Sequence, residues 1–120
     1  MSDNYSLIIK NGSCYIEGKL IKIDLGLSEN KIKKIGKIPL NSSKVVDATD
    51  KVILPGIIDT QTHFREPGST DVEDLESGSR AAVLGGVTSL FEMPNTNPPT
   101  SNLIEFDRKL QLAKDRMHSN

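Results

Sequence analysis

The chain has a single cysteine, Cys14, so no disulfide can form within it. Its N-terminus also lacks the basic segment and apolar leader that would mark export. Its apolar runs, such as residues 7–9 and 52–54, are far shorter than the roughly 20 residues that a membrane-spanning helix needs. These absences predict a protein of the reducing cytoplasm with no membrane partner, in which Cys14 is a packing residue.

A strong charge of either sign is also missing, because 15 Lys and Arg residues stand against 16 Asp and Glu residues. A nucleic-acid partner or an anionic surface would call for a marked basic excess, so we expect neither. The basic cluster at residues 31–34 lies among apolar residues that predict a strand or turn. A solvated face explains it better than a phosphate-binding patch. Composition thus indicates a soluble globular protein.

The first 54 residues predict short β-strands rather than helices. Turn signals at Asn11-Gly12 and Glu29-Asn30 separate apolar stretches, and the first of them predicts a hairpin. The stretches are residues 7–9, 14–16, 20–25 and 32–38. We expect a small β-sandwich-like domain over residues 1–54.

From residue 55 the pattern changes to strand, helix, strand, helix, which is typical of a parallel sheet with crossover helices. Strands are expected at residues 54–58 and 87–91. The helix between them is expected to begin at a capping box in residues 70–73 and to end at Gly85-Gly86. Its predicted inward residues are Val72, Leu75, Ala82 and Val83.

The second helix is expected to begin at Ser101 or Asn102, with Glu105 placed to complete the cap. It should reach His118 in its last turn, where the helix dipole mildly favours a cation. Its apolar stripe, which needs a sheet to cover it, is Leu103, Phe106, Leu110, Ala113 and Met117.

Residues 93–100 contain three prolines and therefore predict a loop at the carboxyl end of the second strand. In α/β folds, this end of the sheet carries the chemistry. At the end of the first strand, Asp59, Gln61 and His63 alternate and should share one face. Two histidines at this spacing would bind a metal, but the first position holds Gln61, a neutral amide.

Each of these residues also has an ordinary explanation when it is taken alone. His63 fits a core or rim histidine, Arg65 and Glu66 fit an ion pair, and Asn95 fits a turn residue. Asp59 fits either a residue behind a metal ligand or a hydrogen-bonding residue at the strand end. Only the combination favours a site.

The motifs together resemble one family, the dihydroorotases and their close relatives in the amidohydrolase superfamily. Residues 55–68 read PGIIDTQTHFREPG, residues 85–88 read GGVT, and residues 93–100 read MPNTNPPT. The family pattern has histidine where this chain has Gln61, and otherwise agrees. The resemblance implies an α/β fold: the small β domain of residues 1–54, followed over residues 55–120 by the first two β/α units of an incomplete (β/α)8 metal-dependent hydrolase barrel.

The same resemblance implies roles for four residues. His63 corresponds to one histidine of the family's metal-binding pair, with Gln61 in the position of the other. Arg65 corresponds to the arginine that binds the substrate carboxylate, and Asn95 to the asparagine that contacts the same substrate. The family's metal is zinc, and Gln61 weighs against zinc binding by this chain. No catalytic residue of the family has a counterpart here.

The activity implied is metal-dependent hydrolysis of the cyclic amide of dihydroorotate, in pyrimidine biosynthesis. A complete barrel takes about 250 residues, whereas 66 follow residue 54, so we expect this chain to be inactive alone. An unpaired sheet edge and an exposed apolar stripe would favour self-association or a partner chain. The alternatives are a non-catalytic structural subunit, a decayed gene product, and a substrate such as allantoin, a dihydropyrimidine or a hydantoin.

Overall fold

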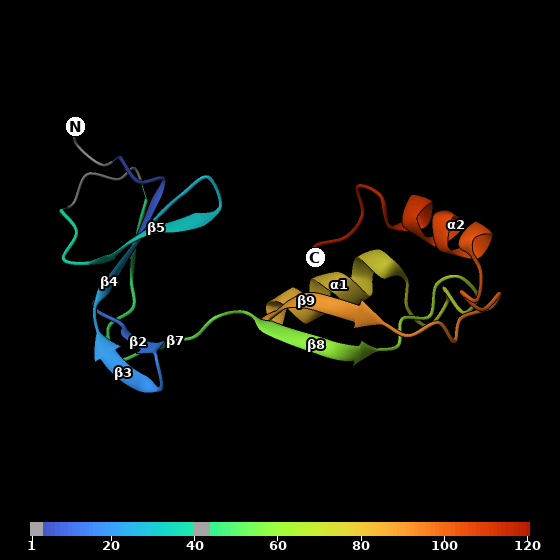
Figure 1. Ribbon diagram of the computed structural model, residues 1–120, viewed down its shortest axis with the longest axis horizontal. Coiled ribbons are helices and arrows are strands. Elements are labelled where there is room, and N and C mark those ends of the chain that lie inside the picture. Colours follow the sequence, from blue (N-terminus) through green and yellow to red (C-terminus); the bar gives the residue numbers. More distant parts are fainter. Residues whose placement is uncertain (1–3, 40–43) are drawn as a thin grey trace. The chain divides into compact units, whose positions relative to one another are not determined.

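The computed structural model describes residues 4–39 and 44–120 and has a mixed α and β fold (Figure 1). The chain divides into two compact units, Met1–Pro55 and Gly56–Asn120. Within the described ranges, no helix has the length and apolar character needed to cross a membrane. Each unit is considered on its own.

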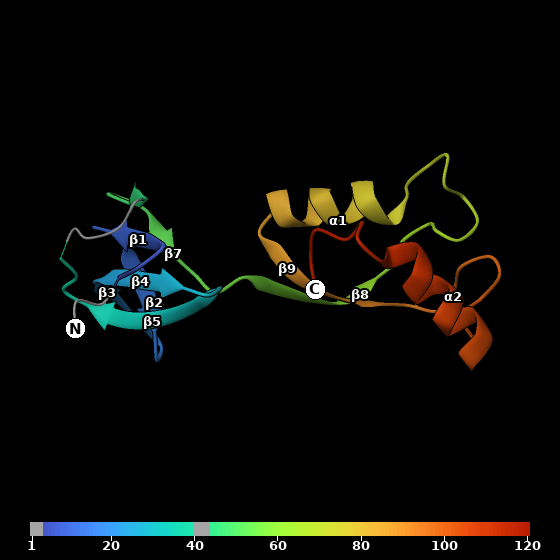
Figure 2. The ribbon, with the colours of Figure 1, turned by 90° about the horizontal axis from the view of Figure 1, so that it is seen from above.

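The first unit consists of two small β-sheets (Figure 2). One sheet has the order β5-β4-β1-β6, and the other has the order β3-β2-β7. In both, a central strand has an antiparallel neighbour on one side and a parallel neighbour on the other. The strands are β1 (Leu7–Lys10), β2 (Ser13–Ile16), β3 (Lys19–Lys22), β4 (Asp24–Ser28), β5 (Lys31–Gly36), β6 (Val45–Asp47) and β7 (Val52–Ile53).

The hairpin expected at Asn11-Gly12 is wrong, because β1 and β2 belong to different sheets. Asn11 has a φ of 66°, and its side-chain amide donates to Asp47 across 3.0 Å, so the turn carries the chain from one sheet to the other. The turn expected at Glu29-Asn30 is confirmed, and it joins the antiparallel strands β4 and β5. Both residues have positive φ, 52° and 58°, as a tight turn between antiparallel strands requires.

Tyr5, Ile8 and Ile38 form a buried apolar cluster in this unit. Gly26 lies so close to Tyr5 that a Cβ there would come within 2.7 Å of the ring. Cys14 is buried as expected, and burial raises the pKa of its thiol.

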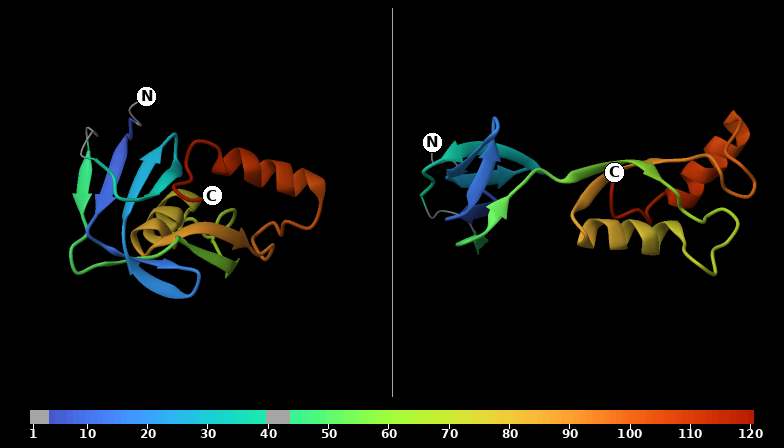
Figure 3. Two further views of the ribbon diagram at one scale, coloured as in Figure 1. Left: turned by 60° about the vertical axis from the view of Figure 1, so that its left-hand side comes forward. Right: turned by 90° about the horizontal axis from the view of Figure 1, so that it is seen from below.

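The second unit follows the expected order of strand, helix, strand, helix: β8 (Ile57–Thr62), α1 (Leu75–Leu84), β9 (Val87–Glu92) and α2 (Leu103–Ala113). The two strands are parallel, and α1 lies along one face of their sheet (Figure 3). At the other edge of β9, the Leu90 amide donates to the Asn120 carbonyl, and the Asn120 amide donates to the Thr88 carbonyl. This alternation is that of a parallel ladder, so the backbone at Asn120 extends the sheet.

The start of α1 corrects the sequence-based expectation by several residues. The N-cap is Asp74, whose carboxylate accepts from the Ser77 amide at 2.7 Å, and not a residue in 70–73. Residues 69–73 instead form turns closed on the Ser69 carbonyl, and Val72 is 72% exposed rather than buried. Leu75 is buried as expected, Ala82 is half-buried, and Val83 is exposed. The helix ends before Gly86, where φ is 92°.

The start of α2 agrees with the expectation, because the Asn102 side chain accepts from the Glu105 amide. Its end does not agree: the helix stops at Ala113, so Met117 and His118 lie beyond it. The His118 amide donates to the Ser79 hydroxyl. The predicted stripe is largely exposed, with Leu103 at 79% and Phe106 at 49%.

Candidate functional site

The carboxyl ends of β8 and β9 lie side by side because the two strands are parallel. Beyond the strands, the Met93 amide donates to the Thr62 carbonyl across 2.8 Å, and the Asn97 amide donates to the Pro67 carbonyl across 3.0 Å. The loops that follow the two strands are thus hydrogen-bonded to each other. They carry most of the residues that the sequence singled out.

His63 and Asn95 lie together at this edge, with 2.8 Å between His63 Nδ1 and Asn95 Oδ1. With the amide oxygen accepting, His63 carries its proton on Nδ1, and Nε2 keeps a free lone pair. Such an arrangement presents Nε2 as a metal ligand or proton acceptor. Asn95 Nδ2 donates to none of the described residues, so it can donate to a ligand.

Asp59 and Gln61 do not complete a metal site around His63. The Asp59 carboxylate accepts from the Gln61 backbone amide across 2.9 Å, which is hydrogen bonding within the strand end. The Gln61 side chain is exposed. Over residues 4–39 and 44–120, no three His, Cys, Asp or Glu side chains are grouped to hold a metal ion. One imidazole and one amide do not fit zinc, which takes about three protein ligands even in an open catalytic site.

Arg65 is exposed and lies between two buried neighbours, Phe64 and Glu66. Its guanidinium makes no hydrogen bond or ion pair with the part of the chain that the structure describes. The alternative of an ordinary Arg65–Glu66 pair is therefore wrong, because Glu66 has a different partner.

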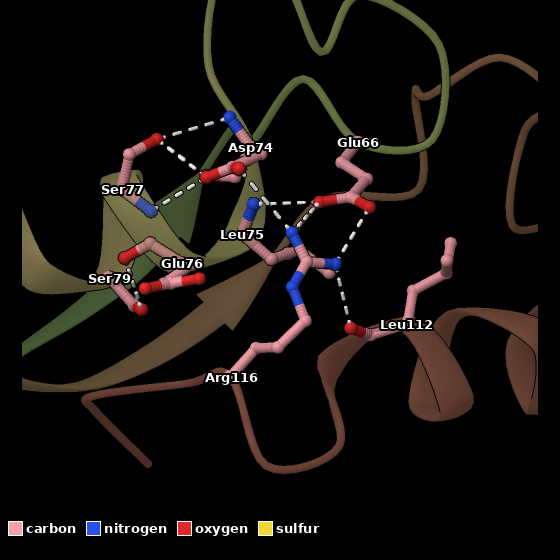
Figure 4. Close-up of polar contacts among 8 residues, drawn as sticks. All are labelled: Glu66, Asp74, Leu75, Glu76, Ser77, Ser79, Leu112 and Arg116. Atoms are coloured by element: carbon pink, nitrogen blue, oxygen red, sulfur yellow. Dashed lines mark hydrogen bonds and ion pairs between the residues drawn. The ribbon is translucent and has the colours of Figure 1, made fainter.

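That partner is Arg116, just beyond α2, which the sequence reasoning did not single out (Figure 4). Arg116 Nη1 and Nη2 donate to the two Glu66 oxygens at 2.8 and 2.9 Å, and the Leu75 amide donates to the same carboxylate at 2.9 Å. Arg116 also donates to the Leu112 carbonyl and lies 3.4 Å from the Asp74 carboxylate. These five residues are called the Glu66–Arg116 cluster below.

Hydrogen bonds from Arg116 hold the pKa of Glu66 below its ordinary value, against the opposing effect of burial. The same interaction raises the pKa of Arg116. No local pattern could have found this pair, because 50 residues separate its members. The only signal was an acidic residue inside the FREPG motif.

A second ion pair, also missed, joins Glu92 at the end of β9 to Lys109 on α2, with 2.7 Å between Oε2 and Nζ. Lys109 Nζ also donates to the Thr96 hydroxyl across 3.4 Å, which ties the loop of Asn95 to α2. Burial raises the pKa of Glu92, although Lys109 and His63 act to lower it. Its Oε1 is buried without a hydrogen-bond partner among the described residues.

A cavity of about 410 Å³ lies in this unit between β9 and α2. Its walls are mainly apolar, and its charged members are the paired Glu92 and Lys109. None of His63, Arg65 and Asn95 lines it. The cavity is therefore a space between the sheet and the helix, and the candidate residues face elsewhere.

Comparisons with known proteins agree on a family. The amidohydrolase family model matches residues 52–118. A dihydroorotase of Lactobacillus helveticus is 47% identical over 91 residues, which are 76% of this chain and 21% of that protein. An allantoinase of Salmonella choleraesuis is 38% identical over 115 residues, which are 95% of this chain and 25% of that protein.

Among solved structures, the L-hydantoinase (dihydropyrimidinase) from Arthrobacter aurescens superposes with a TM-score of 0.86 at 27% identity. The match covers 97% of this chain and 26% of that one. The chain thus spans about a quarter or less of the length of these relatives.

Proposed function

Because this chain belongs to the amidohydrolase family, we propose that it forms the substrate-carboxylate side of a dihydroorotase-like cyclic amidohydrolase. The observation that supports this most is Arg65, an exposed guanidinium without a partner in the described chain. It lies two residues after His63, which is paired with Asn95. In this proposal, residues 1–54 are the small β domain, and residues 55–120 are the first two β/α units of a barrel.

The proposed substrate pair is carbamoyl-aspartate and dihydroorotate, interconverted by ring closure in pyrimidine biosynthesis. A planar guanidinium binds a carboxylate through two parallel hydrogen bonds, which suits Arg65 to the ring carboxylate. Asn95 Nδ2 would donate to a ring carbonyl from the adjacent loop. Allantoin and hydantoin rings lack the carboxylate, so Arg65 favours dihydroorotate over these alternatives.

His63 is proposed only as the counterpart of one metal-binding histidine of the family, and Gln61 occupies the position of the other expected ligand. The other ligands of a zinc hydrolase site are not among the described residues, so we assign no step to a metal. We propose that these 120 residues alone bind the substrate without hydrolysing it.

Turnover assays on the purified chain test this proposal. With dihydroorotate and added zinc, we expect no ring opening above the uncatalysed rate. The control variant is Arg80→Ala, at an exposed arginine of α1. If the chain turns over dihydroorotate, and Arg65→Ala abolishes this turnover whereas Arg80→Ala preserves it, the proposed inactivity is contradicted and the role of Arg65 is supported.

A second candidate function is a non-catalytic subunit that supports a partner enzyme. Gln61 in a ligand position and the exposed apolar residues of α2, among them Leu103 and Ile104, favour it. Size-exclusion chromatography of the protein from its native cells distinguishes the two. A stable complex with an enzyme whose activity depends on this chain supports the subunit role, and a free monomer counts against it.

A further inference from the structure

We propose that Arg116 is a positioning residue for Arg65: by occupying Glu66, it keeps the neighbouring guanidinium of Arg65 free for an anionic ligand. The choice of ligand rests on the function proposed above. The positioning itself rests on the contacts of the Glu66–Arg116 cluster.

The burial pattern shows how the Arg65 backbone is held. Phe64 is 6% exposed and Glu66 is 7% exposed, while Arg65 between them is exposed. Phe64 packs on α1 at Gly78, where a Cβ would come within 2.5 Å of the ring. Glu66 is fixed by Leu75 and Arg116. Because both flanking side chains are anchored inside the protein, Arg65 must point outward.

Arg116 connects three parts of this unit through one guanidinium. It donates to Glu66 in the loop after β8, donates to the Leu112 carbonyl in α2, and lies near Asp74, the N-cap of α1. Five N–H donors in a fixed plane allow this combination, and the lysine ammonium does not reproduce it. The geometry therefore depends on arginine at position 116.

The charge balance supplies the functional consequence. A buried carboxylate needs a cationic or hydrogen-bonding partner, since an unpaired buried charge is strongly unfavourable. Glu66 has its partner in Arg116, so the adjacent Arg65 keeps its positive charge uncompensated. Without Arg116, the nearest cation on the same loop is Arg65 itself. We expect Glu66 to turn outward and pair with it, which would remove the anion-binding group.

Nuclear magnetic resonance of the 120-residue chain with 15N-labelled arginine tests this inference through the Arg65 Nε–Hε signal. In Arg116→Lys, we expect that signal to shift and the exchange protection of the Leu75 amide to fall. Dihydroorotate should bind roughly tenfold more weakly, as expected for the loss of a charge-assisted contact. The matched control is Arg108→Lys, at an arginine of α2 that is exposed, and it should change none of these.

A rescue variant separates this role from a purely structural one. Glu66→Gln combined with Arg116→Lys removes the charge that would capture Arg65, so the Arg65 signal and the binding should return toward those of the unmodified chain. An Arg65 signal that stays unchanged in Arg116→Lys, while Leu75 loses protection, would overturn the inference. If the unmodified chain does not bind dihydroorotate, the proposed function fails, and the Arg65 signal still decides the positioning.

Should Arg116→Lys not fold, the unmodified chain decides the question. The guanidinium protons of Arg116 should exchange with water more slowly than those of Arg65, which should exchange as in a free peptide. The reverse order would overturn the inference.

Discussion

Glu66 is buried and Glu92 is half-buried, and each is paired with a cation. Their pKa values nevertheless move in opposite directions. Glu66 accepts three hydrogen bonds, which outweigh burial and lower its pKa. Glu92 has one buried oxygen without a described partner, so burial prevails and raises its pKa. The ionised form is thus stabilised by folding at Glu66 and disfavoured by folding at Glu92.

The lowered pKa of Glu66 predicts a pH-dependent contribution to stability. Its stabilising effect should be complete above the ordinary value of 4.5 and should be lost as the pH falls through the lower folded value. Glu66→Gln should cost about 1 to 3 kcal/mol near neutral pH, and this cost should shrink toward acid. Urea unfolding of both proteins over a series of pH values measures the difference. A cost that does not change with pH would contradict the assignment of an ionised Glu66.

At the scale of single residues, the sequence predicts those site residues that belong to a local motif. His63 and Asn95 were singled out, and the structure brings their side chains together. Arg116 and Lys109 were missed because their partners Glu66 and Glu92 are distant in sequence, and periodicity carries no information on such pairs. Glu66 itself was misread, because its nearest cation in sequence, Arg65, is not its partner in space.

At the scale of elements, apolar periodicity predicted the order of strands and helices in the second unit. It also predicted that the two strands pair in parallel. The start of α1 was misplaced because residues 70–73 contain the letters of a capping box. The Ser69 carbonyl closes turns there instead, and the Glu66 carboxylate accepts a hydrogen bond from the Leu75 amide. The Asn11-Gly12 turn was misread for a similar reason, since its dipeptide fits a hairpin but the strands beside it join different sheets.

Gly78 provides a test of how tightly α1 packs on the loop that follows β8. In a helix interior, Gly→Ala normally adds about 1 kcal/mol of stability. Here the new Cβ would lie 2.5 Å from Phe64 Cε1 and 2.9 Å from Glu73 Cδ. Because overpacking costs about 1 to 3 kcal/mol, we expect Gly78→Ala to be destabilising. Thermal unfolding measures this. Arg80→Ala, at an exposed position of α1, is the control. Ser77→Ala is not suitable because Ser77 belongs to the capping box.

A stabilised Gly78→Ala variant would contradict this packing. It would show that Phe64 is free to move, so that only Glu66, of the two flanking side chains, would hold the Arg65 backbone in place.

At the scale of the whole molecule, much apolar surface of the second unit faces outward. Leu103, Ile104 and Phe106 on α2 are exposed, as are Ile57, Ile58 and Phe91 on the strands. Exposed apolar surface of this extent marks a face that is covered by another part of a protein or by a partner chain. The relatives are about four times longer than this chain, and in the proposed function their additional β/α units would cover this surface.

The central claim is that the loop following β8 recognises a ring carboxylate through Arg65. Calorimetric titration of the purified chain with dihydroorotate and with dihydrouracil tests it most directly, because the two rings differ in that carboxylate. We predict that dihydroorotate binds about tenfold or more tightly than dihydrouracil, and that Arg65→Ala abolishes this preference whereas Arg80→Ala retains it. Equal affinities for the two rings, or a preference that survives in Arg65→Ala, would contradict the account.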